Sequence, residues 1–112
     1  MYKIYGIPNC NTVKKALTHL DKNKAKYEFI NFKKQPPSKE LLQQWKEAFG
    51  DWPVNKKGPT YRKIKEQFEQ ASAAQKYKIL METTSAIKRP IIAKGSKVIE
   101  FGYDADAYSK IK

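Results

Sequence analysis

The first 32 residues contain the pattern that most restricts how this chain can fold. Residues 2–5 (Tyr-Lys-Ile-Tyr) favour a strand, and Gly6 and Pro8 end it. Apolar residues then recur with the spacing of one helix face: Val13, Ala16, Leu17 and Leu20. Residues 27–32 (Tyr-Glu-Phe-Ile-Asn-Phe) are again typical of a strand. Together they predict a βαβ unit with parallel strands and a right-handed crossover.

Three amphipathic helices are predicted in the middle of the chain. Ser38 is a suitable N-cap for the first of these three helices, and Gly50 can end that helix. Residues 51–60 contain two prolines and one glycine, which indicates an irregular loop. Thr60 can cap the second helix, and the motif Ser72-x-x-Gln75 predicts a capping box for the third.

The last part of the chain predicts a β-hairpin and a short helix. Pro90 has no amide hydrogen, so we expect it to open a strand rather than lie inside one. Residues 94–96 form a turn, residues 97–101 pair back, and Asp104 caps the final helix. This order of strands and helices predicts an α/β fold with a small mixed β-sheet flanked by helices. The length predicts a single domain over residues 1–112.

Composition restricts the location and the cofactors of the protein. No apolar run approaches the ~20 residues of a membrane helix, and the N-terminus lacks a secretory pattern. The single cysteine cannot form an internal disulfide, and one cysteine with one histidine cannot build a metal site. We therefore expect a cytoplasmic monomer with no membrane partner, no metal and no bound cofactor.

The chain is strongly basic, with a formal net charge of +12. Such a charge attracts nucleic acid, anionic surfaces and small anions. The lysines are nevertheless spread over every segment, without the dense stripe that marks a nucleic-acid groove. This distribution favours a solvated, lysine-rich surface.

Cys10 lies between the first predicted strand and the first predicted helix. A thiol at a helix N-terminus is near unpaired N–H groups and the positive end of the helix dipole, which favour the thiolate. Asn9 or Asn11 could cap this helix, and Lys14 adds positive charge. The same N–H groups could bind an oxyanion or a glutathione carboxylate. The alternative is a buried cysteine that acts as a small hydrophobic residue.

Arg89 and the loop residues 55–57 (Asn-Lys-Lys) could join Cys10 at the carboxyl end of the first strand, where α/β sheets place their ligands. A thiolate among such cations suits attack on an oxyanion or a disulfide. Each feature also has a simpler interpretation. Arg89 could form a surface ion pair, the two lysines could be solvated, and Pro90 is trans by default. His19, in the middle of the first helix, is expected to be a surface residue.

Four motifs together carry a family resemblance: residues 5–16, 55–58, 87–90 and 101–104. In order and spacing they resemble the arsenate-reductase-like ArsC/Spx/YffB family, most closely its YffB branch. The resemblance implies a thioredoxin-like fold with a helical insertion between strands 2 and 3. It also implies that Cys10 is the nucleophile, that Arg89 binds anions beside it, and that Pro90 is cis and faces the cysteine. The positions assigned to substrate or thiol binding are Asn9, Asn11, Thr12, Lys14, Asn55, Lys56, Lys57 and Pro90.

Two departures from the arsenate reductases of this family concern the site itself. Those enzymes carry three arginines around the cysteine, whereas only Arg89 has a clear counterpart here. They also carry a histidine four residues before the cysteine and a serine three residues after it, where this chain has Gly6 and Val13. The Spx regulators typically have a Cys-x-x-Cys pair, which Val13 also excludes.

The resemblance leads to two functional hypotheses. The first is a cytoplasmic thiol-dependent reductase related to arsenate reductase. Because the chain has no second cysteine, an external thiol must resolve the Cys10 adduct, most simply glutathione, with glutaredoxin as a further partner. The alternative is a non-enzymatic, Spx-like transcriptional regulator that binds RNA polymerase through its basic surface.

Overall fold

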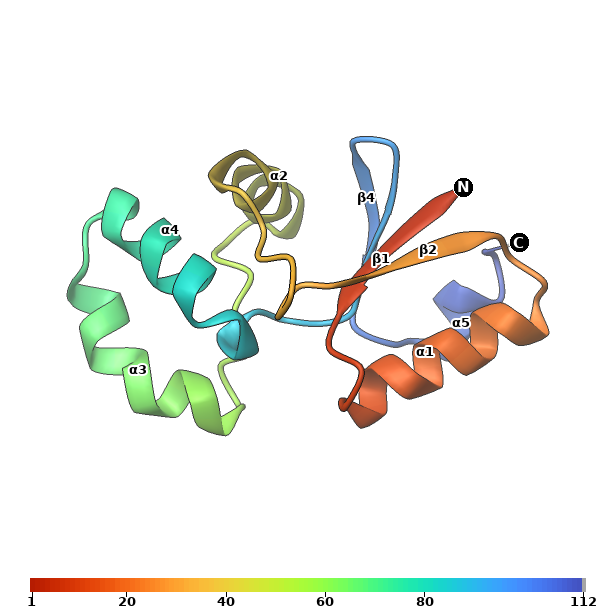
Figure 1. Cartoon of the computed structure of the whole chain (residues 1–112), viewed down its shortest axis with the longest axis horizontal. Helices are drawn as coiled ribbons and strands as arrows, with labels where there is room; N and C mark the ends of the chain where they lie inside the picture. Colours follow the sequence, from red (N-terminus) through yellow and green to blue (C-terminus); the bar gives the residue numbers. More distant parts are fainter. Residues whose placement is uncertain (112) are drawn as a thin grey trace. The chain divides into compact units, whose positions relative to one another are not determined.

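The computed structural model describes residues 1–111 of the chain. Its elements follow the predicted order (Figure 1): β1 (Tyr2–Gly6), α1 (Asn11–Lys22), β2 (Tyr27–Asn31), α2 (Lys39–Phe49), α3 (Pro59–Gln70), α4 (Ala73–Glu82), a 3₁₀ turn (Thr84–Ala86), β3 (Ile91–Lys94), β4 (Lys97–Phe101) and α5 (Ala105–Tyr108). They form two compact units. The first unit comprises residues 1–32 and the chain from Arg89 onward, and the second comprises residues 33–88.

The first unit contains a four-stranded mixed sheet of order β2-β1-β3-β4. β1 and β2 are parallel, with Tyr2 opposite Tyr27 and Gly6 opposite Asn31, and α1 connects them. β3 runs antiparallel to both β1 and β4. The predicted parallel pair, the hairpin and the mixed sheet are therefore confirmed, as is the position of three helices between β2 and β3.

The antiparallel pairing of β1 with β3 brings distant loops to one edge of the sheet. Tyr5, near the end of β1, pairs with Ile91 at the start of β3, and Ile91 also pairs with Phe101 at the end of β4. The Gly102 amide then donates to the Pro90 carbonyl at 2.8 Å. The loops that follow β1, precede β3 and follow β4 consequently share this edge.

The second unit contains the three helices α2, α3 and α4. Ser38 caps α2 by accepting from the Leu41 amide at 3.1 Å, and Gly50 ends that helix in the left-handed region, with a φ of +85°. Both hydrogen bonds of the capping box predicted at Ser72 form at the start of α4.

The prediction that Thr60 caps α3 is wrong. α3 begins two residues earlier than a cap at Thr60 would place it, at Pro59, and Gly58 occupies the cap position. Proline suits the first turn of a helix because its fixed φ is already helical and its missing N–H would have no partner there. The helix therefore starts before the threonine that the sequence offers as a cap.

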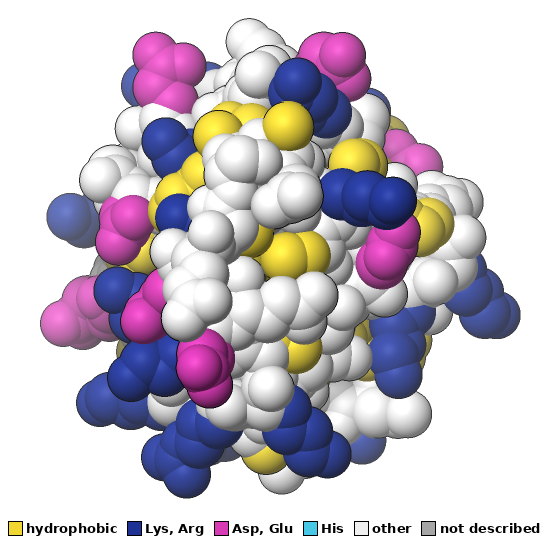
Figure 2. Space-filling view, turned by 90° about the vertical axis from the view of Figure 1, so that its left-hand side faces the viewer, with side chains coloured by type: hydrophobic (Ala, Val, Ile, Leu, Met, Phe, Trp, Pro, Cys, Tyr) yellow, Lys and Arg dark blue, Asp and Glu magenta, His cyan; other side chains and the backbone are white. Residues whose placement is uncertain are grey.

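The basic side chains do not gather into one stripe on the face that Figure 2 shows, where lysines and arginines are interspersed with acidic side chains. Some lysines of the second unit instead lie over aromatic rings. Lys46 Nζ is 4.9 Å from the centre of the Trp52 ring, and Lys76 Nζ is 5.6 Å from it. On this face, the observations agree with the dispersed charge expected from the sequence.

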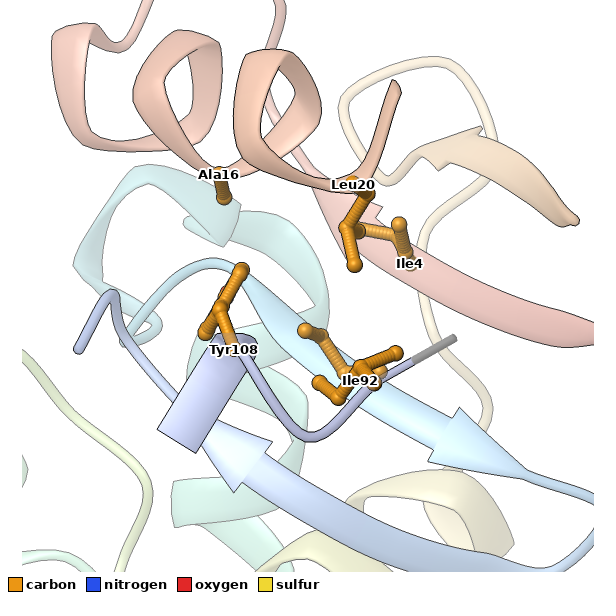
Figure 3. Close-up of a cluster of buried hydrophobic side chains, with 6 residues drawn as sticks. Ile4, Ala16, Leu20, Ile92 and Tyr108 are labelled. Atoms are coloured by element: carbon orange, nitrogen blue, oxygen red, sulfur yellow. The ribbon is translucent and has the colours of Figure 1, made fainter. Parts of the chain in front are cut away.

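The core of the first unit holds α1 against the sheet. Ala16 and Leu20 of α1 point toward Ile4 of β1 and Ile92 of β3, and Tyr108 of α5 lies in the same cluster (Figure 3), to which Ile111 also belongs. The five side chains labelled in Figure 3 have 0% exposure. Burial of each large apolar side chain contributes about 1.5–3 kcal/mol to folding, so this cluster holds α1 against the sheet.

Candidate active site

Cys10 is the N-cap residue of α1. Its backbone is extended, with φ −88° and ψ 125°, and its carbonyl accepts the Lys14 amide at 3.0 Å. Its own amide donates to the Ile7 carbonyl at 3.2 Å, which closes the turn after β1. The prediction that Asn9 or Asn11 caps α1 is therefore wrong, because the turn places Asn9 outside the helix and Asn11 inside it.

The start of α1 packs directly against the end of β1. A Cβ atom added to Gly6 would lie only 3.0 Å from Val13 Cγ2, and Val13 is completely buried. Glycine is therefore the residue that allows this close approach. Gly6 and Val13 are two of the positions at which the sequence departs from the pattern that the resemblance gives for the arsenate reductases, and the structure shows that they contact each other.

The surroundings of the Cys10 sulfur favour its charged form. Partial burial by itself raises the pKa of the Cys10 thiol. Three hydrogen bonds to the sulfur lower this pKa, and they come from the Val13 amide, the Arg89 guanidinium and the Thr12 amide. The positive charge of Arg89 lowers it further, so the pKa of Cys10 lies below its ordinary value. The cysteine side chain makes no regular capping hydrogen bond. Its sulfur nevertheless lies near the amides of Thr12 and Val13, where the side-chain oxygen of a serine or aspartate cap would accept a hydrogen bond.

Arg89 reaches Cys10 because of the sheet register. It lies two residues before Ile91, which pairs with Tyr5 near the end of β1. The Arg89–Pro90 peptide bond is cis, as the resemblance implies and contrary to the trans default. Pro90 is buried and Arg89 is half-buried. That Pro90 faces the cysteine stays a prediction.

The other predicted binding residues of the first unit surround Cys10 in the chain. Asn9, Asn11, Thr12 and Lys14 are all exposed. Thr12 acts on the sulfur through its backbone amide. Sequence reasoning missed the amide of Val13, although a helix cap at Cys10 would have predicted it, since a cap side chain faces the amides two and three residues on.

Asn55, Lys56 and Lys57 belong to the second unit. The Asn55 amide donates to the Ala86 carbonyl at 2.9 Å. Lys56 forms an exposed ion pair with Asp51 at 3.6 Å. All three predicted residues line a cavity of about 450 Å³ in this unit. Their contribution to the Cys10 site stays a prediction.

His19 lies on the outer face of α1 and is partly exposed, but it is not an isolated surface residue as expected. Its Nδ1 lies 2.9 Å from the Tyr103 hydroxyl, and its ring centre is 5.8 Å from that of Tyr108. The prediction failed because these tyrosines follow β4, and only the folded sheet brings them to α1.

Residues 1–111, which the structure describes, show neither a metal cluster nor a membrane-spanning helix. No three histidine, cysteine, aspartate or glutamate side chains gather there in a way that could hold a metal ion. None of the helices in this part of the chain has the length and apolar character needed to cross a membrane.

Comparison with known proteins identifies the family. The model of the ArsC family matches residues 5–111. The chain belongs to the ArsC family. An uncharacterized protein of Haemophilus influenzae is 33% identical over 110 residues, which are 96% of each chain. The resemblance stated from the sequence motifs is therefore confirmed.

Solved structures show the same fold. A protein named YFFB has a TM-score of 0.86 at 33% identity, over 99% of this ArsC-family chain and 98% of its own. A possible arsenate reductase from Streptococcus mutans has a TM-score of 0.77 at 31% identity, over 92% of this chain and 91% of its own. The predicted thioredoxin-like fold with a helical insertion is thus confirmed.

Proposed function

We propose that this ArsC-family protein is a thiol-dependent reductase whose nucleophile is Cys10. The observation that carries the proposal is the convergence of two backbone amides and the Arg89 guanidinium on one sulfur. The thiolate is the reactive form of cysteine, so a lowered pKa increases the nucleophile present at neutral pH.

The reaction proceeds by two exchanges when the substrate is a disulfide, RS–SR′. The Cys10 thiolate attacks one sulfur, the S–S bond breaks, and R′S⁻ leaves with the electron pair, so that a mixed disulfide Cys10–S–SR forms. A glutathione thiolate then attacks the R sulfur and releases the Cys10 thiolate, and GS–SR is the product. Over the cycle one glutathione replaces R′S⁻, which takes up a proton from solvent.

The need for an external thiol follows from the cysteine count. Cys10 is the only cysteine of the chain, so no internal thiol can resolve the mixed disulfide. Glutathione is the small thiol that we propose, with glutaredoxin as the enzyme that recycles the product. Arsenate, the oxyanion implied by the name of the Streptococcus mutans neighbour, is the second substrate to test.

Arg89 has two roles in this proposal. Its positive charge stabilises the thiolate before attack. Its planar guanidinium can also donate two parallel hydrogen bonds to a carboxylate of glutathione or to an oxyanion, which orients that group beside the sulfur.

The test combines reactivity and turnover. We expect the alkylation rate of Cys10 to have a midpoint below pH ~8.5, and mass spectrometry to show a glutathione adduct after treatment with oxidised glutathione. The Cys10→Ser variant should retain its fold and lose turnover of a mixed-disulfide substrate and of arsenate. Full turnover by that variant, or slow alkylation with an ordinary midpoint, would overturn the proposal.

The net charge of +12 supports one alternative, a regulator that binds RNA polymerase. Its test is co-precipitation from lysate with the wild-type chain and with Cys10→Ser. Equal recovery of polymerase subunits by both, together with an unreactive thiol, would favour the regulator. Failure to recover polymerase at modest salt would exclude it.

A further inference from the structure

The outer face of α1 borders a cavity of about 500 Å³ in the first unit. This volume lies within the range of about 300–1,000 Å³ that is typical of small-molecule sites. Six residues line the cavity: Lys14, Lys15, Thr18, His19, Lys22 and Tyr103. The activity proposed for Cys10 does not account for most of them.

The lining residues of α1 form two adjacent rows with a spacing of four. Lys14, Thr18 and Lys22 make one row, and Lys15 and His19 make the other. The helix buries its opposite side, as the packing of Ala16 and Leu20 shows. With a rise of about 1.5 Å per residue, Lys15 and Lys22 lie about 10 Å apart along the helix axis, which is enough for a ligand with more than one charged group.

The charge of this face is uncompensated. Within the described residues 1–111, none of the side chains that line the cavity is acidic. Nor does α1 have an acidic residue in its first turn, where Lys14 and Lys15 lie close to the positive end of the helix dipole. Nearby Asp21 accepts a hydrogen bond from the Tyr27 hydroxyl at 2.7 Å and does not line the cavity. Lys22 lies in the last turn, near the negative end of the dipole. The charges that cost helix stability are therefore those of Lys14 and Lys15, and a bound anion would offset them.

The wall opposite the lysines is fixed by tertiary contacts. Tyr103 is held by the 2.9 Å contact with His19 and by edge-on packing against Tyr108, with ring centres 4.8 Å apart. The Tyr108 hydroxyl donates to the Gly102 carbonyl at 2.8 Å, which secures the turn that carries Tyr103.

The histidine–tyrosine pair adds a neutral donor to this site. A neutral His19 has one N–H and Tyr103 has one O–H, and the hydrogen bond between them uses one of these two protons. In either tautomer the other proton remains available to a ligand. The cavity therefore offers three ammonium groups and one neutral donor.

We propose that this cavity binds a small molecule that carries at least two phosphate groups. Lysine binds phosphate as a point charge, and the three lysines that line the cavity can together offset the several negative charges of a ligand with two phosphate groups. The proposal is independent of the reductase activity, because binding is measured without turnover.

The test is a titration of the full chain with inorganic pyrophosphate at ~0.1 M salt, where long-range attraction is screened, followed by amide NMR shifts. We expect saturable shifts confined to α1 and the segment around Tyr103. The variant Lys15→Gln/Lys22→Gln should weaken binding about tenfold, which corresponds to about 1.4 kcal/mol. Tyr103→Phe should weaken it less.

A matched control separates this site from general charge. Lys63→Gln/Lys65→Gln removes the same two charges from the exposed side of α3, and it should leave the affinity unchanged. Equal weakening by both double variants, or shifts without saturation, would overturn the proposal. A nucleoside diphosphate that binds more tightly than pyrophosphate would identify an organic phosphate as the ligand, and equal affinities would indicate recognition of the phosphates alone.

Discussion

Replacement of Arg89 by glutamine measures how far the guanidinium activates Cys10. A hydrogen bond to a charged group contributes about 1.5–3 kcal/mol. Cys10 is only half-buried, so solvent screens the pair and we take a value just below that range, about 1.4 kcal/mol. A loss of about 1.4 kcal/mol changes an ionisation equilibrium about tenfold, so we expect Arg89→Gln to raise the pKa of Cys10.

This shift has opposite effects at low and high pH. Below both pKa values the thiolate fraction falls about tenfold, but each thiolate becomes more nucleophilic as its pKa rises, with a Brønsted coefficient of about 0.4–0.5. The net rate of exchange with a neutral disulfide should therefore fall about three- to fourfold at low pH. Above both pKa values, where the thiol is fully ionised in both proteins, the variant should react about threefold faster. The two pH–rate curves should consequently cross.

Stopped-flow measurement with a neutral aromatic disulfide between pH 4 and pH 10 would test this crossing. Arg89→Lys keeps the charge but loses the planar donor group, and it should lie between the wild type and Arg89→Gln. Lys88→Gln is the matched control. It removes one charge from the preceding residue, whose ammonium lies 5.9 Å from the centre of the Phe49 ring, and it should not move the midpoint. Superimposed curves for the wild type and Arg89→Gln would refute the role given to Arg89.

Three further predictions concern stability. Gly6→Ala should cost about 1–3 kcal/mol in urea unfolding because its methyl group meets Val13; the double variant with Val13→Ala should lose less than the sum of the two single losses, and an unchanged midpoint for Gly6→Ala would contradict the packing argument. Ser72→Ala should cost about 1 kcal/mol in thermal unfolding, whereas Ser96→Ala, in an exposed turn, should cost nothing, so equal effects would count against the capping box. Because the folded-state pKa of Cys10 is lowered, the stabilisation by its thiolate is full above the unfolded pKa of ~8.5 and is lost as pH falls through the folded value. The difference in stability between the wild type and Cys10→Ser should therefore grow with pH across that window, and a flat difference would show that the thiolate is not stabilised.

Local patterns predicted most of the secondary structure because they depend on neighbours in the chain. The apolar spacing of α1, the capping box at Ser72 and the stop at Gly50 were all confirmed. The helix starts were less predictable where several residues could serve as caps. Packing of Val13 on Gly6 and the fixed φ of Pro59 decided those cases.

The sequence by itself determined the local chemistry of Cys10. It placed one cysteine between a predicted strand and a predicted helix, and that position predicted that N–H groups of the first helical turn would favour the thiolate. The absence of a second cysteine likewise follows from the sequence alone.

Only the tertiary structure decided which distant residues join that helix. The antiparallel register of β1 and β3 carries Arg89 to the end of the strand that precedes Cys10, and the β3–β4 hairpin returns Tyr103 to His19. The motifs suggested Arg89 through family resemblance, and no pattern in the chain suggested Tyr103. Strand register is set by which face of the sheet is buried in the core. It therefore brings together residues that are far apart in the sequence, and no local periodicity marks them beforehand.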